Sequence, residues 1–167
     1  THTRQAPMLR SLVGSEMCIR DRLNPPKGTD VKAFLLKAKD LLGAVDAINV
    51  TDSHGSKMSL SPVAAAKLIK DMDVEPILQM TTRDRNRIAL QSDMMGAWVL
   101  GIENVICMGG DPPNLGDHPE AKPVFDIPTE ELIRAAASLN EGHDLMSNPL
   151  KGKTGFNVGA VVNPGAC

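Results

Sequence analysis

Helical segments and short apolar segments alternate strictly along this chain, and that alternation constrains the fold more than any other feature. It predicts four amphipathic helices, at residues 30–42, 59–72, 85–100 and 129–139. It also predicts four short apolar strands, at residues 44–51, 76–81, 104–108 and 155–162. Strands that alternate with helices form a parallel sheet covered by helices. We therefore expect an α/β protein, either a doubly wound sheet or a βα barrel, whose first strand has been lost.

The composition excludes several classes of protein. Twenty acidic side chains stand against 18 basic ones, so no positive surface for nucleic acid or for an anionic membrane is expected. The three cysteines lack the paired spacing of a disulfide framework or a zinc knuckle. No apolar run reaches the roughly 18 residues of a membrane helix. We expect a cytoplasmic protein that has no metal, nucleic-acid or membrane partner.

The first 22 residues differ from the rest of the chain. They contain arginine but no lysine, and they show neither a helical nor a strand period. Residues 11–22 resemble the translation of a transposon mosaic end, the adapter used to build sequencing libraries. We interpret residues 1–22 as a non-native leader and residues 23–167 as the authentic domain, truncated at both ends. A native disordered leader is the alternative.

Polar residues gather where the predicted strands end. In parallel α/β folds the ligands bind beyond the carboxyl ends of the strands, because the loops that follow the strands meet there. The candidate binding residues at these ends are Thr51, Asp52, Gln79, Gly109, Gly110 and Asp111.

The most unusual stretch is Gly109–Pro113, with the sequence Gly-Gly-Asp-Pro-Pro. Two glycines allow the backbone to approach a flat ligand closely, and the proline that follows Asp111 holds this residue in an extended conformation. A carboxylate fixed there can accept a hydrogen bond from the N–H of a heterocycle. The alternative is a tight turn with a solvated aspartate. The stretch matches neither a dinucleotide fingerprint nor a phosphate loop.

Three arginines lie close together at Arg83, Arg85 and Arg87. Their guanidinium groups could bind a phosphate or a carboxylate through paired hydrogen bonds. The alternative is a helix start that Asp84 caps, with Arg83 and Arg87 in solvent.

These motifs together resemble the methylenetetrahydrofolate reductase family of flavoproteins. The matching stretches are residues 23–28, 45–51, 81–93, 96–104, 109–113 and 116–126. The resemblance implies an eight-stranded βα barrel, a TIM barrel, of which this chain supplies about half. It also implies FAD as cofactor: NAD(P)H reduces the flavin, which then passes a hydride to 5,10-methylenetetrahydrofolate and yields 5-methyltetrahydrofolate.

The resemblance assigns roles to the candidate residues. Asp111 corresponds to the family acid near the pyrimidine edge of the flavin and the folate, where its charge strengthens the reduced flavin as a hydride donor. Gly109 and Gly110 correspond to the backbone beside the ring. Thr51 and Asp52 correspond to the end of the second strand, which faces flavin and nicotinamide. The sixth candidate, Gln79, occupies a cofactor-binding position where histidine is common.

One departure concerns the catalytic acid. The family carries a glutamate two residues before the position of Asn24, and it protonates the folate so that its five-membered ring opens. Here that position is Arg22, which cannot supply a proton at neutral pH. No catalytic acid is therefore intact, and we expect this chain to be inactive.

Two alternatives to a truncated flavoenzyme stay open. One is a non-catalytic partial barrel that pairs with a complementary half. The other is a βα-barrel enzyme that acts on one-carbon substrates without flavin. A homo-oligomer also stays open, as does the choice between NADH and NADPH.

Overall fold

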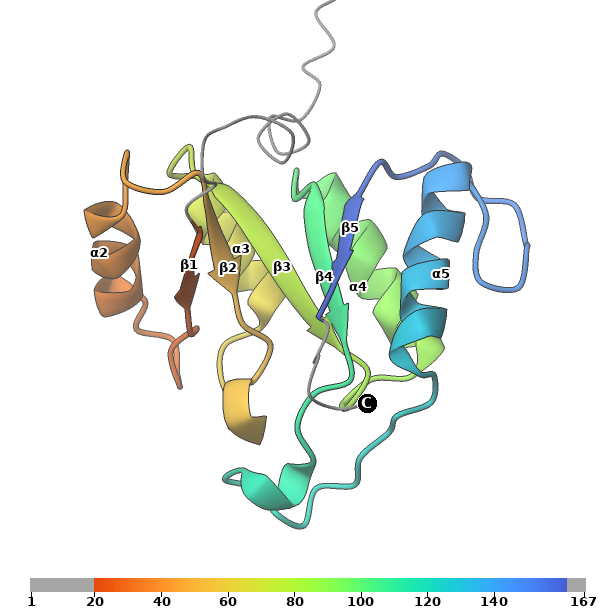
Figure 1. Cartoon of the computed structure of the whole chain (residues 1–167), viewed down its shortest axis with the longest axis horizontal. Coiled ribbons are helices and arrows are strands. Elements are labelled where there is room, and N and C mark those ends of the chain that lie inside the picture. Colours follow the sequence, from red (N-terminus) through yellow and green to blue (C-terminus); the bar gives the residue numbers. More distant parts are fainter. Residues whose placement is uncertain (1–19, 162–167) are drawn as a thin grey trace, which may run out of the picture.

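Five parallel strands form a single curved sheet in the computed structural model, which describes residues 20–161 (Figure 1). The strands are β1 (Arg20–Leu23), β2 (Ala47–Val50), β3 (Glu75–Thr81), β4 (Asn104–Met108) and β5 (Asn157–Ala160). Each strand pairs in parallel with the next one along the chain, so the spatial order is the chain order. A doubly wound sheet reverses its strand order at a switch point, whereas a barrel does not. The barrel prediction is therefore confirmed, and the chain forms a sector of a (βα)8 barrel.

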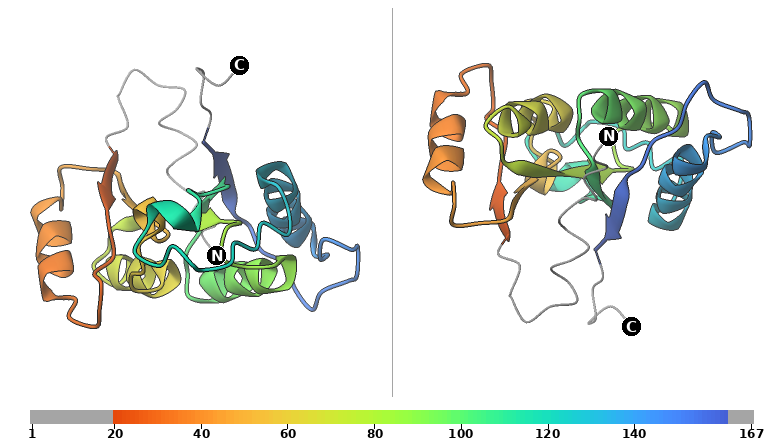
Figure 2. Two further views of the ribbon diagram at one scale, coloured as in Figure 1. Left: turned by 90° about the horizontal axis from the view of Figure 1, so that it is seen from below. Right: turned by 90° about the horizontal axis from the view of Figure 1, so that it is seen from above.

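All four α-helices lie on the convex side of the sheet (Figure 2). They are α2 (Lys32–Asp40), α3 (Pro62–Lys70), α4 (Arg87–Val99) and α5 (Thr129–Glu141). Local chemistry sets their ends: α3 starts with a proline in its first turn, and α5 ends at Gly142 in the left-handed region, with a φ of 87°. The four predicted helices are thus confirmed, with ends within three residues of the expected ones.

Strand β1 corrects one expectation, because the first strand is present rather than lost. Leu23 lies opposite Val50 and is buried in the core, and Arg22 lies opposite Asn49. A strand at the edge of a sheet is held by backbone hydrogen bonds, which need no apolar pattern. Because these residues lack an apolar pattern, the strand could not be predicted from the sequence. Most of the interpreted leader, residues 1–19, lies outside the described residues, as do residues 162–167.

The core lies between the sheet and the helices. Alternation along the strands turns one set of apolar side chains toward the helices, which contribute small residues that allow close approach. The principal members are Val50, Leu78, Met80, Val105 and Cys107 from the strands, and Ala65, Ala66, Ile69, Met94, Leu132 and Leu139 from the helices. Burial raises the pKa of the Cys107 thiol to about 12.

Hydrogen-bonded side chains close the amino end of the sheet. Lys70 Nζ donates to Glu75 Oε2 (2.8 Å), and Asn104 Nδ2 donates to Glu75 Oε1 (2.7 Å). Asn157 Nδ2 in turn donates to Asn104 Oδ1 (3.0 Å). The polar groups at this end satisfy one another, so the carboxyl end is the end left for a ligand. Among the described residues, no helix has the length and apolar character needed to cross a membrane.

Candidate active site

The loops that follow the strands gather at the carboxyl end of the sheet, where Figure 1 shows two short 3₁₀ helices, η1 (His54–Ser56) and η2 (Pro113–Leu115). All six candidate residues lie at or next to this end. Thr51 and Asp52 follow β2, Gln79 lies within β3, and Gly109–Asp111 follow β4. The shared location is as predicted, while the binding roles of the six residues stay predictions.

Thr51 joins the ends of β1 and β2. Its Oγ1 donates to Asn24 Oδ1 (2.9 Å), and its backbone N–H donates to Leu23 O (3.2 Å). Thr51 and Asn24 border a cavity of about 450 Å³. The other residues around this cavity are Pro25, Lys27, His54, Gly55, Lys57, Met58, Ser59 and Asp117. The mouth of the barrel sector is therefore hollow beside the end of β2.

Asp52 is an anchor between elements. Its Oδ2 accepts hydrogen bonds from Thr81 N (2.8 Å) and Thr81 Oγ1 (3.0 Å), and it forms an ion pair with Arg85 Nη2. The buried carboxylate thus joins the ends of β2 and β3 to the start of α4. If Asp52 contacts a cofactor as predicted, the contact would be made by the other carboxylate oxygen, Oδ1.

Gln79 places an amide on the concave side of the sheet. Its neighbours Leu78 and Met80 face the helices, so Gln79 faces the opposite way, beside Ile106 of β4. The side chain is 8% exposed, and its amide has no hydrogen-bond partner among the described residues. An amide held in this way can both donate a hydrogen bond to a ligand and accept one.

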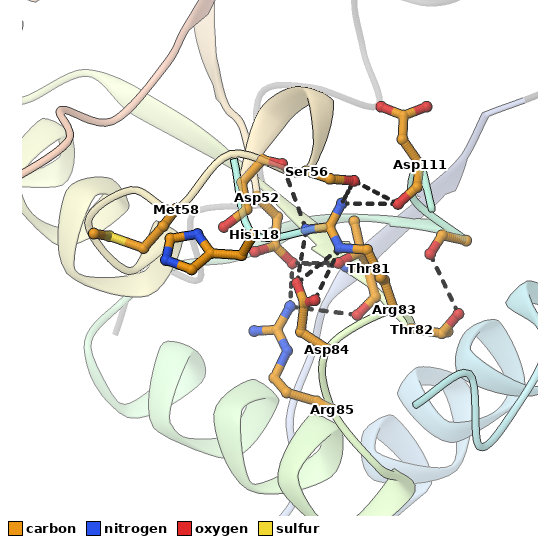
Figure 3. Close-up of polar contacts among 12 residues, drawn as sticks. Asp52, Ser56, Met58, Thr81, Thr82, Arg83, Asp84, Arg85, Asp111 and His118 are labelled. Atoms are coloured by element: carbon orange, nitrogen blue, oxygen red, sulfur yellow. Dashed lines mark hydrogen bonds and ion pairs between the residues drawn. The ribbon is translucent and has the colours of Figure 1, made fainter. Parts of the chain in front are cut away.

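Gly110 allows the loop after β4 to pack against β3. Its φ is +89°, and a Cβ atom there would lie 3.1 Å from Thr81 Cβ and 3.4 Å from Arg83 Cβ. The next residue, Asp111, exposes its side chain while its carbonyl oxygen accepts hydrogen bonds from Ser56 Oγ (2.6 Å) and Arg83 Nη1 (3.3 Å). Figure 3 shows the carboxylate of Asp111 pointing away from these contacts. The loop is therefore held by its backbone, and within residues 20–161 the Asp111 carboxylate makes no hydrogen bond that would keep it from a ligand.

Arg83 overturns one alternative from the sequence, in which this side chain lies in solvent. It is 2% exposed, and all five of its N–H donors are used within the protein. The hydrogen bond with Asp84 raises the pKa of Arg83 above its ordinary value, although burial opposes this shift. A guanidinium group with no free donor cannot bind a phosphate, so Arg83 is a structural group.

The other residues of the arginine motif also serve the fold. Asn86, not Asp84, caps α4: its Oδ1 accepts from Ile88 N (3.1 Å) and Ala89 N (3.0 Å). Asp84 is instead occupied by the guanidinium of Arg83. Arg87, which the alternative leaves in solvent, is 41% exposed and forms an ion pair with Asp126 (2.8 Å) in the loop before α5.

Asp117 is a residue that the sequence did not single out. It forms an ion pair with Lys27, accepts from Met58 N (3.0 Å) and contacts His118 Nδ1 (2.8 Å). The hydrogen bond from Lys27 is the main reason that the pKa of Asp117 lies well below its usual range. Two of its partners, Met58 and Lys27, are 59 and 90 positions away, so no local pattern could have revealed them.

Arg22 occupies the position at which the family resemblance places the catalytic glutamate. Because Leu23 faces the core, Arg22 faces the concave side of the sheet, near Asn49. The side chain at this position therefore faces the barrel interior, as a proton donor there would need to. Within residues 20–161, no three His, Cys, Asp or Glu side chains come together as metal ligands.

Comparison with known proteins agrees with this geometry. The family model of methylenetetrahydrofolate reductase matches residues 12–143, a range that spans β1 to α5 and every candidate residue. A search of curated proteins gave no match. The matched range covers well over half of the chain, so the chain belongs to the methylenetetrahydrofolate reductase family.

Proposed function

We propose that this chain is part of a flavin-dependent reductase that converts 5,10-methylenetetrahydrofolate into 5-methyltetrahydrofolate at the expense of NAD(P)H. One observation carries the proposal beyond family membership. Gln79 on β3 has an amide without a hydrogen-bond partner in residues 20–161, and the exposed carboxylate of Asp111 lies in the loop after the neighbouring strand β4.

The residues at this end fit the ring of FAD. The polar edge of the ring presents N–H and C=O groups, which the Gln79 amide and the Asp111 carboxylate complement. Ile106 and Met108 are half-buried on the concave face and offer an apolar surface to the ring. When bound, the flavin would carry the electrons between nicotinamide and folate.

The carboxylate of Asp111 has an electrostatic role in this proposal. With FAD bound, the Asp111 carboxylate would place a fixed negative charge beside the ring, which would oppose further negative charge on the ring and so favour hydride transfer to the folate. Asp111 can do this because its backbone, rather than its carboxylate, makes the contacts that hold the loop.

The identity of the natural residue at position 22 tests the proposed catalytic acid. A glutamate there would face the interior and could protonate the folate, whereas Arg22 stays protonated at neutral pH and cannot. We propose that residues 1–22 are not native and that the genomic codon before Leu23 encodes glutamate. Sequencing the source locus tests this, and a genomic arginine codon would contradict it.

A chimeric enzyme tests the function itself. Residues 23–161 would replace the equivalent strands and helices of an active flavin-dependent family member, with either glutamate or arginine at position 22. Both versions should purify with FAD, and the arginine version should turn over about 10²-fold to 10⁴-fold more slowly. Folded chimeras that bind no FAD would overturn the proposal and favour the flavin-free alternative.

The 167-residue chain by itself is expected to purify without stoichiometric FAD, because its five described strands provide only part of a barrel. Stoichiometric FAD together with turnover of methylenetetrahydrofolate would contradict this expectation. A cytoplasmic location and a homo-oligomer stay predictions of the sequence.

A further inference from the structure

Arg83, in the loop after β3, contacts two other loops at the carboxyl end at once. Its Nη2 donates to Ser53 O (3.4 Å) in the loop after β2, and its Nη1 donates to Ser56 Oγ (3.1 Å) in η1. The same Nη1 donates to Asp111 O (3.3 Å) in the loop after β4. Arg83 itself follows β3, so one buried side chain joins the ends of three neighbouring strands (Figure 3).

The contacts at Asp111 form a closed triangle. Arg83 Nη1 and Ser56 Oγ both donate to the Asp111 carbonyl, and Arg83 also donates to Ser56. Two donors on one carbonyl oxygen fix the peptide plane, and the side chain of an aspartate has only two rotatable bonds beyond it. These hydrogen bonds therefore restrict the position of the Asp111 carboxylate through the backbone, without contacting the carboxylate itself.

Asp84 orients the guanidinium group of Arg83 and neutralises its charge. Its carboxylate accepts from Arg83 Nε (2.9 and 3.0 Å) and Nη2 (2.7 Å), which fixes the plane of the guanidinium. The Nη1 group is thereby aimed at Ser56 and Asp111. Because Asp84 supplies the counter-charge, the carboxylate of Asp111 need not turn inward to pair with Arg83.

We propose that Arg83 is a positioning residue for Asp111, acting through the Asp111 carbonyl group. The significance of that position for flavin chemistry rests on the proposed function, whereas the positioning itself does not. Lysine cannot replace arginine here, since its three donors lack the planar fork that reaches Asp84, Ser53, Ser56 and Asp111 together.

Hydrogen exchange of the 167-residue chain tests the positioning without any ligand. The reporters are the amides of Leu115 and Gly116, which donate to Pro112 O (3.1 Å) and Pro113 O (2.9 Å) just beyond Asp111. In Arg83→Lys these two amides should exchange roughly tenfold faster, while amides within β3 and β4 keep their rates. The matched control is Arg134→Gln on α5, whose side chain is 69% exposed, and it should change neither set.

Unchanged exchange at Leu115 and Gly116 in Arg83→Lys would overturn the proposal. If that variant does not fold, Ser56→Ala decides, because it removes only one of the two donors to the Asp111 carbonyl. Faster exchange confined to the same two amides in Ser56→Ala supports the triangle, and unchanged exchange there overturns it.

A double-mutant cycle in the chimeric enzyme tests the link to Asp111, with the FAD dissociation constant and the visible flavin spectrum as readouts. Arg83→Lys and Asp111→Asn should each weaken FAD binding, and the double variant should be no weaker than Asp111→Asn alone. Additive effects would mean that Arg83 acts only on the general fold, and they would overturn the proposal. If the chimera binds no FAD while the exchange results hold, the proposed function fails and the positioning role stands.

Discussion

At the scale of single residues, Asp117 ties the loop after β4 to the loops after β1 and β2. Its pKa is held low chiefly by the hydrogen bond from Lys27, so the folded state favours the charged form. The contribution to stability is therefore complete above the ordinary carboxyl pKa, about 4, and is lost as the pH falls below that value toward the folded pKa.

The prediction concerns the pH dependence of thermal unfolding. Asp117→Asn should lower the unfolding temperature at pH 7, and the difference from the unmodified chain should shrink below about pH 4. Asp40→Asn, at an exposed position at the end of α2, is the control and should behave like the unmodified chain at both pH values. A difference for Asp117→Asn that stays constant down to pH 2 would contradict the assignment.

Two glycines give opposite predictions on substitution by alanine. A Cβ at Gly116 would overlap the backbone oxygen of Ser56, so Gly116→Ala must displace the loop. A Cβ at Gly96, inside α4, meets nothing within 4 Å. Denaturant unfolding should show Gly116→Ala destabilised, and Gly96→Ala stabilised by about 0.5–1 kcal/mol, because glycine is a poor helix former. Equal effects of the two substitutions on stability would contradict the close packing of Gly116 against the backbone of Ser56.

The candidate site was only partly predictable from the sequence. Asp111 and Gly110 stand out because glycine and proline flank a charged residue, which is a local signal. Arg83 looked like an anion site because a sequence shows its charge but not its partners. Those partners lie 27 to 30 positions away in two other loops, and only the fold brings them within reach.

At the scale of elements, two side chains satisfy the first amides of α4: Asp126 Oδ2 accepts from Arg87 N (2.9 Å), and Asn86 caps the next two. The Asn86 carboxamide oxygen satisfies two of the amides that the first turn leaves without helical partners. Asn86→Ala should therefore lower the free energy of unfolding by about 1 kcal/mol, measured by urea denaturation. Asn86→Ser keeps an acceptor and should retain most of the stability. Equal losses in both variants would mean that another group caps this helix.

The helices were more predictable than the strands. An amphipathic helix repeats its pattern over three or more turns, and its ends carry residues such as Pro62 and Gly142 whose preferences are local. Strands of four residues carry little pattern: β2 was expected over residues 44–51 but spans Ala47–Val50. β1 carries almost none, since three of its four residues are charged.

At the scale of the whole molecule, the described sheet has an edge on each side, at β1 and β5. An edge strand presents unpaired backbone groups that can pair with another chain. Val161, directly after β5, is 61% exposed and adds an apolar side chain to that edge. We therefore expect this chain to self-associate as its concentration rises.

Sedimentation velocity would measure this association. Val161→Lys should reduce it, because a charged side chain at an edge opposes pairing with a second strand. Leu36→Lys, on α2 at 62% exposure, adds the same charge away from the edge and serves as the control. An equal reduction in both variants would point to net charge rather than to the strand edge.

The burial of Cys107 gives this molecule a built-in reporter. The thiol lies on β4, in the core, three positions before Gly110, and it is protonated at neutral pH. Alkylating reagents attack the thiolate, so they can reach this sulfur only when the sheet separates from the helices. With Cys18 and Cys167 replaced by serine, the labelling rate would time each opening beneath the candidate site. The rate of maleimide labelling could thus rank variants of that site by how often the core beneath it opens. The measurement needs neither bound flavin nor substrate.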